Sequence, residues 1–187
     1  MNILCLHGCC QTTDRLQNLM RDYIKIFPSD TKWYFIEAKY DHSRCGKTWF
    51  QPELSLDQIG TDVVEMDEIT TVLNDIDTKI KENKINVLIG FSQGGNVVDC
   101  YLRLFNNDNI KCVVILSGYS FPKLIKNPVI LPILYISSEK DEIVSKNLIP
   151  TDYTNMTLIL HDKGHKIPTQ KTIIKQILEF IKNNIYM

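Results

Sequence analysis

A serine lies between two glycines near the middle of the chain, where residues 90–94 read Gly-Phe-Ser-Gln-Gly. An apolar run precedes this stretch and an amphipathic segment follows it, which predicts a strand, a sharp turn and a helix with Ser92 at the turn. An ordinary tight turn is the alternative, because glycine and serine favour turns in general. The flanking strand and helix favour a nucleophile elbow, which holds the serine hydroxyl at the positive end of a helix.

A serine hydroxyl is a weak nucleophile at neutral pH, so Ser92 needs a neighbouring base, which is most often a histidine. The chain offers His7, His42, His161 and His165. His165 is favoured, because it lies in a polar loop beyond the last predicted strand and has the freedom to reach the serine. His161, at the end of that strand, is the main rival. His7 is expected to shape the turn after the first strand, and His42 to lie on the surface.

The base in turn needs a carboxylate that fixes its orientation. Asp141 is favoured, because it lies a few residues beyond a predicted strand and precedes two apolar residues that would anchor its loop. Glu139, Asp152 and Asp162 are the rivals. The order serine, aspartate, histidine along the chain is the one expected for an elbow on this kind of sheet.

Attack on a carbonyl group also requires preorganised N–H donors for the oxyanion that forms. The backbone N–H of Gln93, directly after the nucleophile, is one predicted donor. The loop after the first strand supplies the second, and Cys9 is the predicted residue. A nucleophilic role for the Cys9 thiol stays open as an alternative.

Alternating apolar strands and amphipathic helices must position these residues. Strands are predicted over Ile3–Leu6, Trp33–Ile36, Ile85–Ile89, Cys112–Leu116, Ile133–Ile136 and Met156–Leu160, and helical stripes over residues 16–27, 66–80, 97–105 and 173–185. This pattern predicts an α/β protein with a mainly parallel sheet that is buried on both faces. Because function gathers at the carboxyl ends of such strands, Ser92, Asp141 and His165 are expected to meet there.

Between about residues 37 and 61 the periodicity is lost, which predicts a long functional or mobile loop. Trp49 and Phe50 lie in this loop and are candidates to line an acyl pocket. Packing of both side chains onto the core is the alternative, and it is slightly favoured.

The composition limits the other possibilities. A chain of 187 residues is expected to form a single domain over residues 1–187. The net charge is −1 and the charged residues are dispersed along the chain, which argues against a nucleic-acid partner. With neither a leader pattern nor a membrane-spanning run, the sequence predicts a cytoplasmic protein without an integral membrane segment. The six cysteines match no zinc spacing, so free thiols and no metal are expected.

Several stretches together resemble the α/β-hydrolase fold. More narrowly, they are similar to the phospholipase/carboxylesterase and acyl-protein thioesterase group and to the fungal family-of-serine-hydrolases group. The stretches are Leu-Cys-Leu-His-Gly at 4–8, Lys-Thr-Trp-Phe at 47–50, Gly-Phe-Ser-Gln-Gly-Gly at 90–95, Asp141 with Val144, and Gly164 with His165. The resemblance covers nearly the whole chain.

The resemblance implies a three-layer α/β/α sandwich with a mainly parallel central sheet and a minimal lid. It implies Ser92 as nucleophile, His165 as base and Asp141 as its orienting acid, with Cys9 and Gln93 N–H groups at the oxyanion. It further implies hydrolysis of carboxylic esters or thioesters without metal or cofactor. The substrates would be small acyl esters or thioesters, with acyl-proteins and lysolipids within the range of the group.

Two departures and several open questions accompany the resemblance. Serines stand at 137 and 138 where a glycine is frequent, and Lys163 replaces the first of two glycines before the histidine. The short chain leaves little room for a lid, which favours an open site. The alternatives are a binding module that has lost or reused the site, a lactone hydrolase and a peptidase. Acyl length, oxygen or sulfur ester, and oligomeric state are left open.

Overall fold

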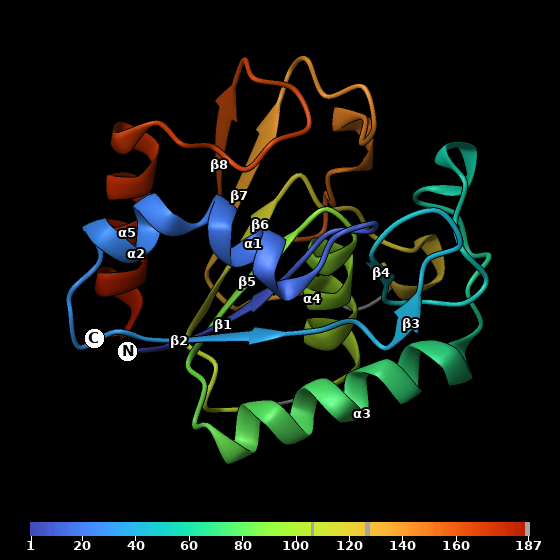
Figure 1. Cartoon of the computed structure of the whole chain (residues 1–187), viewed down its shortest axis with the longest axis horizontal. Helices are drawn as coiled ribbons and strands as arrows, with labels where there is room; N and C mark the ends of the chain where they lie inside the picture. The colour runs from blue at the N-terminus through green and yellow to red at the C-terminus, as the bar shows by residue number, and fades with distance from the viewer. Residues whose placement is uncertain (106, 126–127, 186–187) are drawn as a thin grey trace.

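A computed structural model describes residues 1–105, 107–125 and 128–185 (Figure 1). The strands are β1 (Asn2–Leu6), β2 (Lys32–Ile36), β3 (Tyr40–Asp41), β4 (Lys47–Thr48), β5 (Val87–Phe91), β6 (Cys112–Leu116), β7 (Ile133–Ser138) and β8 (Met156–His161). The helices are α1 (Thr13–Leu19), α2 (Arg21–Ile26), α3 (Met66–Glu82), α4 (Gln93–Leu104) and α5 (Lys171–Ile185). Short 3₁₀ helices cover Leu56–Gln58, Pro122–Leu124 and Lys146–Leu148.

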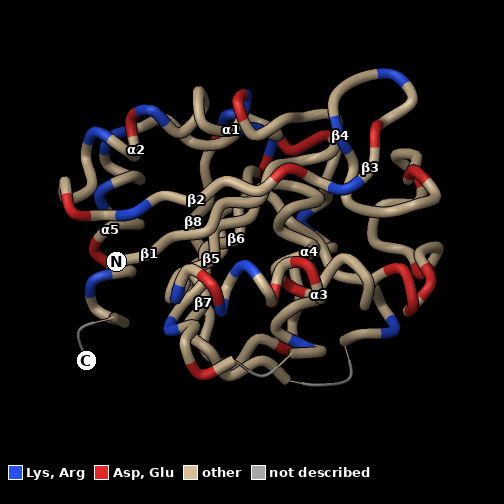
Figure 2. The backbone as a smooth tube through the Cα atoms, turned by 60° about the horizontal axis from the view of Figure 1, so that its bottom comes forward, with Lys and Arg blue, Asp and Glu red and all other residues tan. Residues whose placement is uncertain are grey.

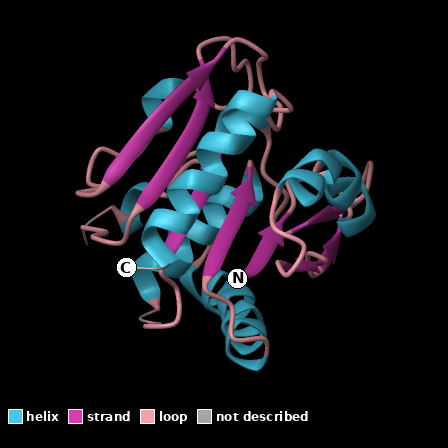
Figure 3. Cartoon of the chain, turned by 90° about the vertical axis from the view of Figure 1, so that its left-hand side faces the viewer, coloured by secondary structure: helices cyan, strands magenta, loops and turns pink. Residues whose placement is uncertain are grey.

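Six strands form one sheet in the order β2-β1-β5-β6-β7-β8, and every neighbouring pair is parallel. The prediction of six strands in a mainly parallel α/β sheet is therefore confirmed. β5, which leads into the elbow, lies between β1 and β6 in the interior of the sheet and is buried along its whole length. The carboxyl ends of the strands point to one edge of the sheet (Figure 3).

Helices cover both faces of this sheet and enclose two apolar clusters. Along β1, Ile3 and Cys5 belong to one cluster and Leu4 and Leu6 to the other, because successive strand residues face opposite sides. Helices α3 and α4 pack on the face of Leu4, and α1, α2 and α5 pack on the face of Ile3 (Figure 1). The predicted three-layer arrangement is thus present.

The long connection after β2 differs from the expected irregular loop. β3 and β4 form a small antiparallel pair within it, with Tyr40 opposite Thr48. The turn between these strands folds back on the loop after β1, where the Cys10 N–H donates to the Lys47 carbonyl at 2.9 Å. This connection therefore packs against the loop predicted to supply an oxyanion donor.

Two cysteines contradict the expectation of six free thiols. Cys10 and Cys45 form a disulfide with their Cα atoms 5.0 Å apart. Cys5, Cys100 and Cys112 are free and buried, and the free thiol of Cys9 is half-buried. The sequence prediction was wrong for this pair because the folding back of the turn before β4, which no local pattern indicates, brings the two residues together.

Positively and negatively charged residues are interspersed along the backbone (Figure 2). A buried cluster of charged residues is centred on Arg103 in α4. The Arg103 Nε lies 2.9 Å from Asp99 Oδ1, and the Arg103 Nη2 lies 3.0 Å from Asp152 Oδ1. The Tyr153 hydroxyl donates to the same Asp99 oxygen. Burial raises the pKa of Asp99, and the positive charge of Arg103 opposes this increase only in part. This network ties α4 to the segment before β8.

Replacing Arg103 by methionine is expected to lower the free energy of unfolding by about 3–5 kcal/mol, because the buried Asp99 carboxylate loses its charged partner. Urea denaturation of the wild type and variant measures the loss. Arg21→Met, an exposed arginine, is the control and should change stability by less than about 0.5 kcal/mol. Adding Asp99→Asn should recover part of the loss, and a purely additive double variant would contradict the coupling.

Candidate active site

Ser92 occupies a sharp turn between β5 and α4, with a backbone φ of +54°. The two flanking glycines make this turn possible. A Cβ at Gly90 would lie 2.4 Å from the Gly94 carbonyl oxygen, and one at Gly94 would lie 2.4 Å from the Leu6 oxygen. Neither contact is sterically tolerable, so the close packing of β1, β5 and α4 requires glycine at both places. The strand, turn and helix predicted around Ser92 are all present.

Three predicted residues from distant parts of the chain meet at the carboxyl edge of the sheet. The Ser92 Oγ lies 2.9 Å from the His165 Nε2. On the other side of the imidazole, Nδ1 lies 2.8 Å and 3.0 Å from the two carboxylate oxygens of Asp141. An ionised carboxylate only accepts hydrogen bonds, so it places the proton on Nδ1 and leaves Nε2 to accept from the serine. This is the tautomer that a general base at His165 requires.

Asp141 is fixed by its own loop. Its Oδ1 accepts hydrogen bonds from the backbone N–H groups of Ile143 at 3.0 Å and Val144 at 2.8 Å, and its side chain is fully buried. Burial acts to raise the pKa of this carboxyl, but the hydrogen bonds from His165 and Val144 outweigh it, so the pKa lies below its usual value. Asp141 is therefore held as a carboxylate beside His165. The rivals Asp152 and Asp162 pair with Arg103 and Lys163 instead.

The sequence did not indicate the role of Ser138, at the end of β7. Its hydroxyl accepts hydrogen bonds from the N–H groups of Lys140 at 3.1 Å and Gly164 at 3.0 Å. One side chain thus connects the loop of Asp141 to the loop of His165. The only signal in the sequence was a serine at a strand end, where the resembling families often have glycine. Gly164, which donates to the Ser138 hydroxyl, lies 26 residues further along the chain, so no local pattern indicates this contact.

The predicted oxyanion donors lie in the loop after β1 and at the first residue of α4. The Gly8 N–H donates to the Gln11 side chain at 3.2 Å, which shapes the loop after β1. The Gln93 side-chain oxygen accepts from Thr48 Oγ1 at 3.1 Å and Trp49 N at 3.0 Å. Among the described residues, neither the Cys9 N–H nor the Gln93 N–H donates to another group. Both N–H groups are free to donate a hydrogen bond to an oxyanion.

The Cys9 thiol is a poor candidate for the nucleophile. Burial raises its pKa, and hydrogen bonds involving Thr48 and Cys10 only partly oppose this effect. A thiol is nucleophilic as the thiolate, so a raised pKa disfavours it. Cys9 therefore fits a backbone role better than a chemical one.

Trp49 and Phe50 pack into the core. Their side chains are 2 % and 0 % exposed. The indole N–H of Trp49 donates to the His7 carbonyl at 2.8 Å, and the Phe50 ring packs edge-on against Phe121. These contacts support the packing alternative for both residues, and neither lines the cavity beside the triad.

The other histidines have separate structural partners. His7 is fully buried, donates from Nδ1 to the Gly8 carbonyl at 2.8 Å and accepts at Nε2 from the Ala38 N–H at 3.0 Å. His42 Nε2 lies 3.6 Å from Glu53. His161 accepts from the N–H of Lys163 at 3.1 Å and so helps to shape the loop before His165.

The buried imidazole of His7 predicts a loss of stability in mild acid. Burial lowers the pKa of His7, although the Gly8 carbonyl and Glu37 oppose this effect. Below about pH 6.5, the usual histidine pKa, the unfolded chain takes up a proton that the folded chain resists. The free energy of unfolding should therefore fall as the pH drops from there towards the folded pKa. Thermal unfolding of the wild type and His7→Gln between pH 8 and 5 measures this, and equal pH slopes would contradict the role of His7.

One group of possible metal ligands occurs in the described part of the chain. Atoms of Cys9, Cys10 and His42 lie within 4.8 Å of one another. The Cys10 sulfur is bonded to Cys45, so it is not available as a thiolate in this structure. None of the three belongs to the hydrogen-bonded chain of Ser92, His165 and Asp141.

Several esterases are similar to this chain in sequence or in structure. Esterase AGAP003155 of Anopheles gambiae is 21 % identical over 211 residues, covering 99 % of this chain and 78 % of that protein. The crystal structure of Arabidopsis thaliana SOBER1 superposes with a TM-score of 0.76 at 20 % identity and covers 99 % of both chains. A carboxylesterase from Mesorhizobium loti gives a TM-score of 0.74 at 14 % identity, over 97 % of this chain and 88 % of its own. These structural similarities confirm the expected α/β-hydrolase fold.

No helix in the described residues combines the length and apolar character needed to cross a membrane. The family model described as "Serine hydrolase (FSH1)" matches residues 1–177, which include the elbow, the acid and the histidine. The chain therefore belongs to this serine hydrolase family, in agreement with the resemblance seen in its sequence.

Proposed function

We propose that this serine hydrolase cleaves carboxylic esters or thioesters through an acyl-enzyme on Ser92. The observation that carries the proposal is the continuous hydrogen-bonded chain from Ser92 Oγ through both ring nitrogens of His165 to Asp141. An esterase that is similar in sequence and a carboxylesterase with the same fold support the choice of an ester bond as the target.

The reaction follows from this arrangement. Ser92 Oγ attacks the acyl carbonyl carbon while His165 Nε2 accepts the hydroxyl proton, and Asp141 stabilises the imidazolium that results. The oxyanion accepts hydrogen bonds from the N–H groups of Cys9 and Gln93. The C–O or C–S bond then breaks, and His165 returns the proton to the leaving alcohol or thiol. Water attacks the acyl-enzyme by the same steps, with His165 as base, and releases the acid.

Further parts of the proposal concern the substrate and setting. The substrate is a small acyl ester or thioester, and acyl-proteins or lysolipids are further members of the same chemical class. No metal or cofactor takes part in the steps above, and no nucleic-acid partner is proposed. We also propose that residues 1–187 form a single domain that acts in the cytoplasm. The four free thiols agree with a reducing compartment, whereas the Cys10–Cys45 disulfide argues against one.

A fluorophosphonate probe tests the proposal on the intact protein. The wild type is expected to be labelled at one site, and mass spectrometry of the digested protein should place the label on Ser92. A panel of acyl esters and thioesters, with a lactone and a peptide substrate, then identifies the bond that is cleaved. Absence of both labelling and turnover would favour a binding module on this fold over an enzyme.

A further inference from the structure

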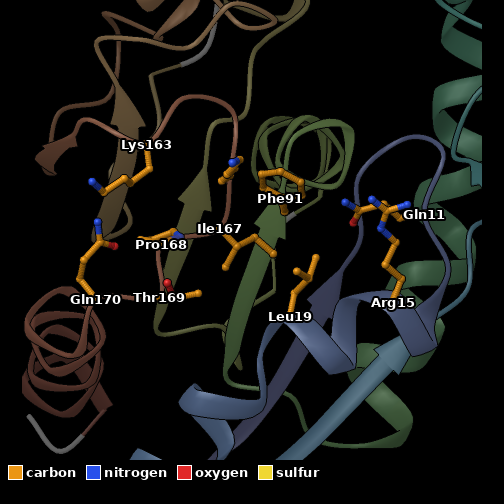
Figure 4. A pocket seen from close by; sticks show the side chains of 10 residues that line it. Gln11, Arg15, Leu19, Phe91, Lys163, Ile167, Pro168, Thr169 and Gln170 are labelled. Carbon is orange, nitrogen blue, oxygen red and sulfur yellow. The ribbon is translucent and has the colours of Figure 1, made fainter.

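A cavity of about 680 Å³ opens next to the proposed triad. It lies between helix α1, the end of β5 and the segment from Lys163 to Gln170 that carries the proposed base (Figure 4). Its volume is within the range of about 300–1,000 Å³ that is usual for small-molecule sites.

The walls of the cavity are built from the same segments that hold the reacting groups. Phe91 directly precedes Ser92, and its ring centroid lies 5.1 Å from that of His165. Gln11, on the opposite wall, accepts the hydrogen bond from the Gly8 N–H that shapes the oxyanion loop. A substrate with its carbonyl at Ser92 can therefore extend one end into this cavity.

The lining combines positive charge with apolar surface. Arg15, Lys163 and Lys166 contribute the charged groups, and no aspartate or glutamate lines the cavity. Lys163 pairs with Asp162 outside the lining, with Nζ 3.2 Å from the carboxylate. Within the described residues, Arg15 and Lys166 form no ion pair, so their charges have no carboxylate partner.

Apolar side chains form the rest of the surface. Leu19, on α1, is 39 % exposed although it is large and apolar, and Phe91 and Ile167 lie across from it (Figure 4). A ligand with a short hydrocarbon segment would cover this surface, and an anionic group at its end would reach Arg15, Lys163 and Lys166. A neutral, wholly apolar ligand would leave the cations without a partner.

We infer that the cavity binds a carboxylate or phosphate group of the substrate, so that the enzyme prefers anionic esters or thioesters. This inference rests on the proposed function, since it takes Ser92 as the point of attack. Arg15, Lys163 and Lys166 are then specificity-determining residues. They act on substrate binding and are not placed in the proton-transfer chain.

Three matched esters test the inference. They are p-nitrophenyl acetate, p-nitrophenyl hemisuccinate with a carboxylate on the acyl side, and a p-nitrophenyl acetate whose ring carries a carboxylate on the leaving-group side. The ratio of kcat/KM for an anionic ester to that for the neutral ester is measured at low salt. The cavity variant combines Arg15→Gln, Lys163→Gln and Lys166→Gln. It should lower this ratio roughly tenfold, because each exposed charge contributes only a modest amount to the binding free energy.

The effect should appear mainly in KM and should shrink as ionic strength rises, since salt screens exposed charges. Which of the two anionic esters is affected tells whether the acyl or the leaving-group end enters the cavity. Inorganic phosphate and free succinate, tested as competitive inhibitors, distinguish the two kinds of anion. The control combines Lys171→Gln, Lys175→Gln and Lys182→Gln, which remove the same charge from exposed positions on α5 outside the cavity.

Equal ratios for the wild type and the cavity variant with both anionic esters would overturn the inference, as would an equal drop in the α5 control. A binding measurement separates this outcome from failure of the proposed function. Calorimetry of Ser92→Ala with each anionic ester and with p-nitrophenyl acetate requires no turnover. Tighter binding of an anionic ester, lost in the cavity variant, would support the inference even without catalysis, and its absence would overturn it.

Discussion

Replacing Ser92 by alanine is expected to lower kcat for ester hydrolysis by about 10⁶-fold, the scale seen when a nucleophilic serine is removed from a triad. The hydroxyl that lies 2.9 Å from His165 Nε2 is lost, and no acyl-enzyme can form. Alanine keeps the Cβ and the backbone at φ +54°, so the fold should be retained. Initial rates with a p-nitrophenyl ester and labelling by a fluorophosphonate measure the two consequences.

Ser117 provides a matched control for this substitution. Like Ser92 it has a positive φ, at +47°, and it directly follows β6, the strand beside β5 in the sheet. Unlike the half-buried Ser92, it is buried. Ser117→Ala should leave labelling and turnover within a few fold of the wild type. Turnover by Ser92→Ala that an alkylating thiol reagent abolishes would assign the nucleophile to Cys9 instead and contradict the proposed mechanism.

Replacing Asp141 by asparagine is expected to lower kcat by about 10⁴-fold while leaving the site geometry nearly intact. In the wild type the Asp141 carboxylate accepts a hydrogen bond from the N–H at His165 Nδ1. An asparagine amide in the same place can turn its NH₂ group towards that nitrogen, which moves the ring proton to Nε2. An Nε2 that carries the proton cannot accept the hydroxyl proton of Ser92.

Glu142→Gln is the control, because it makes the same change in charge on an exposed neighbour in the same loop. Its turnover should match that of the wild type. Circular dichroism and thermal unfolding show whether the Asp141→Asn protein is folded. A folded variant with less than a tenfold loss would contradict the proposed role of Asp141.

Local patterns in the sequence contained much of the fold. The apolar runs of β1, β5, β6 and β7 are buried strands because a parallel sheet covered on both faces excludes water from both sides of its inner strands. The edge strands β2 and β8 are partly exposed, so the expected burial of the sheet on both faces was wrong for them. The elbow was predictable because glycine at 90 and 94 is a local steric requirement, which the structure shows as contacts of 2.4 Å for an added Cβ. His165, favoured over His161 because of its place in the loop beyond a strand, is the histidine that contacts Ser92.

Contacts between distant segments were not accessible in the same way. Ser138 connects two loops through hydrogen bonds to Lys140 and Gly164, and nothing around a serine shows that a glycine 26 residues away will face it. The Cys10–Cys45 disulfide depends on a turn that folds back over 35 residues. The burial of Trp49 is likewise decided by its neighbours, since its N–H groups are satisfied by His7 and Gln93.

The sequence by itself determined the chemical types at the strand ends, namely a serine at a glycine-flanked turn, an acid and a histidine in the right order. Tertiary structure alone decided the distances of 2.8–3.0 Å between them and the Ser138 contact that joins their loops. It also decided that Arg15 and Lys163 line one cavity. The physical reason is that periodicity reports which face of an element is buried, whereas contacts between loops depend on how the whole sheet is assembled.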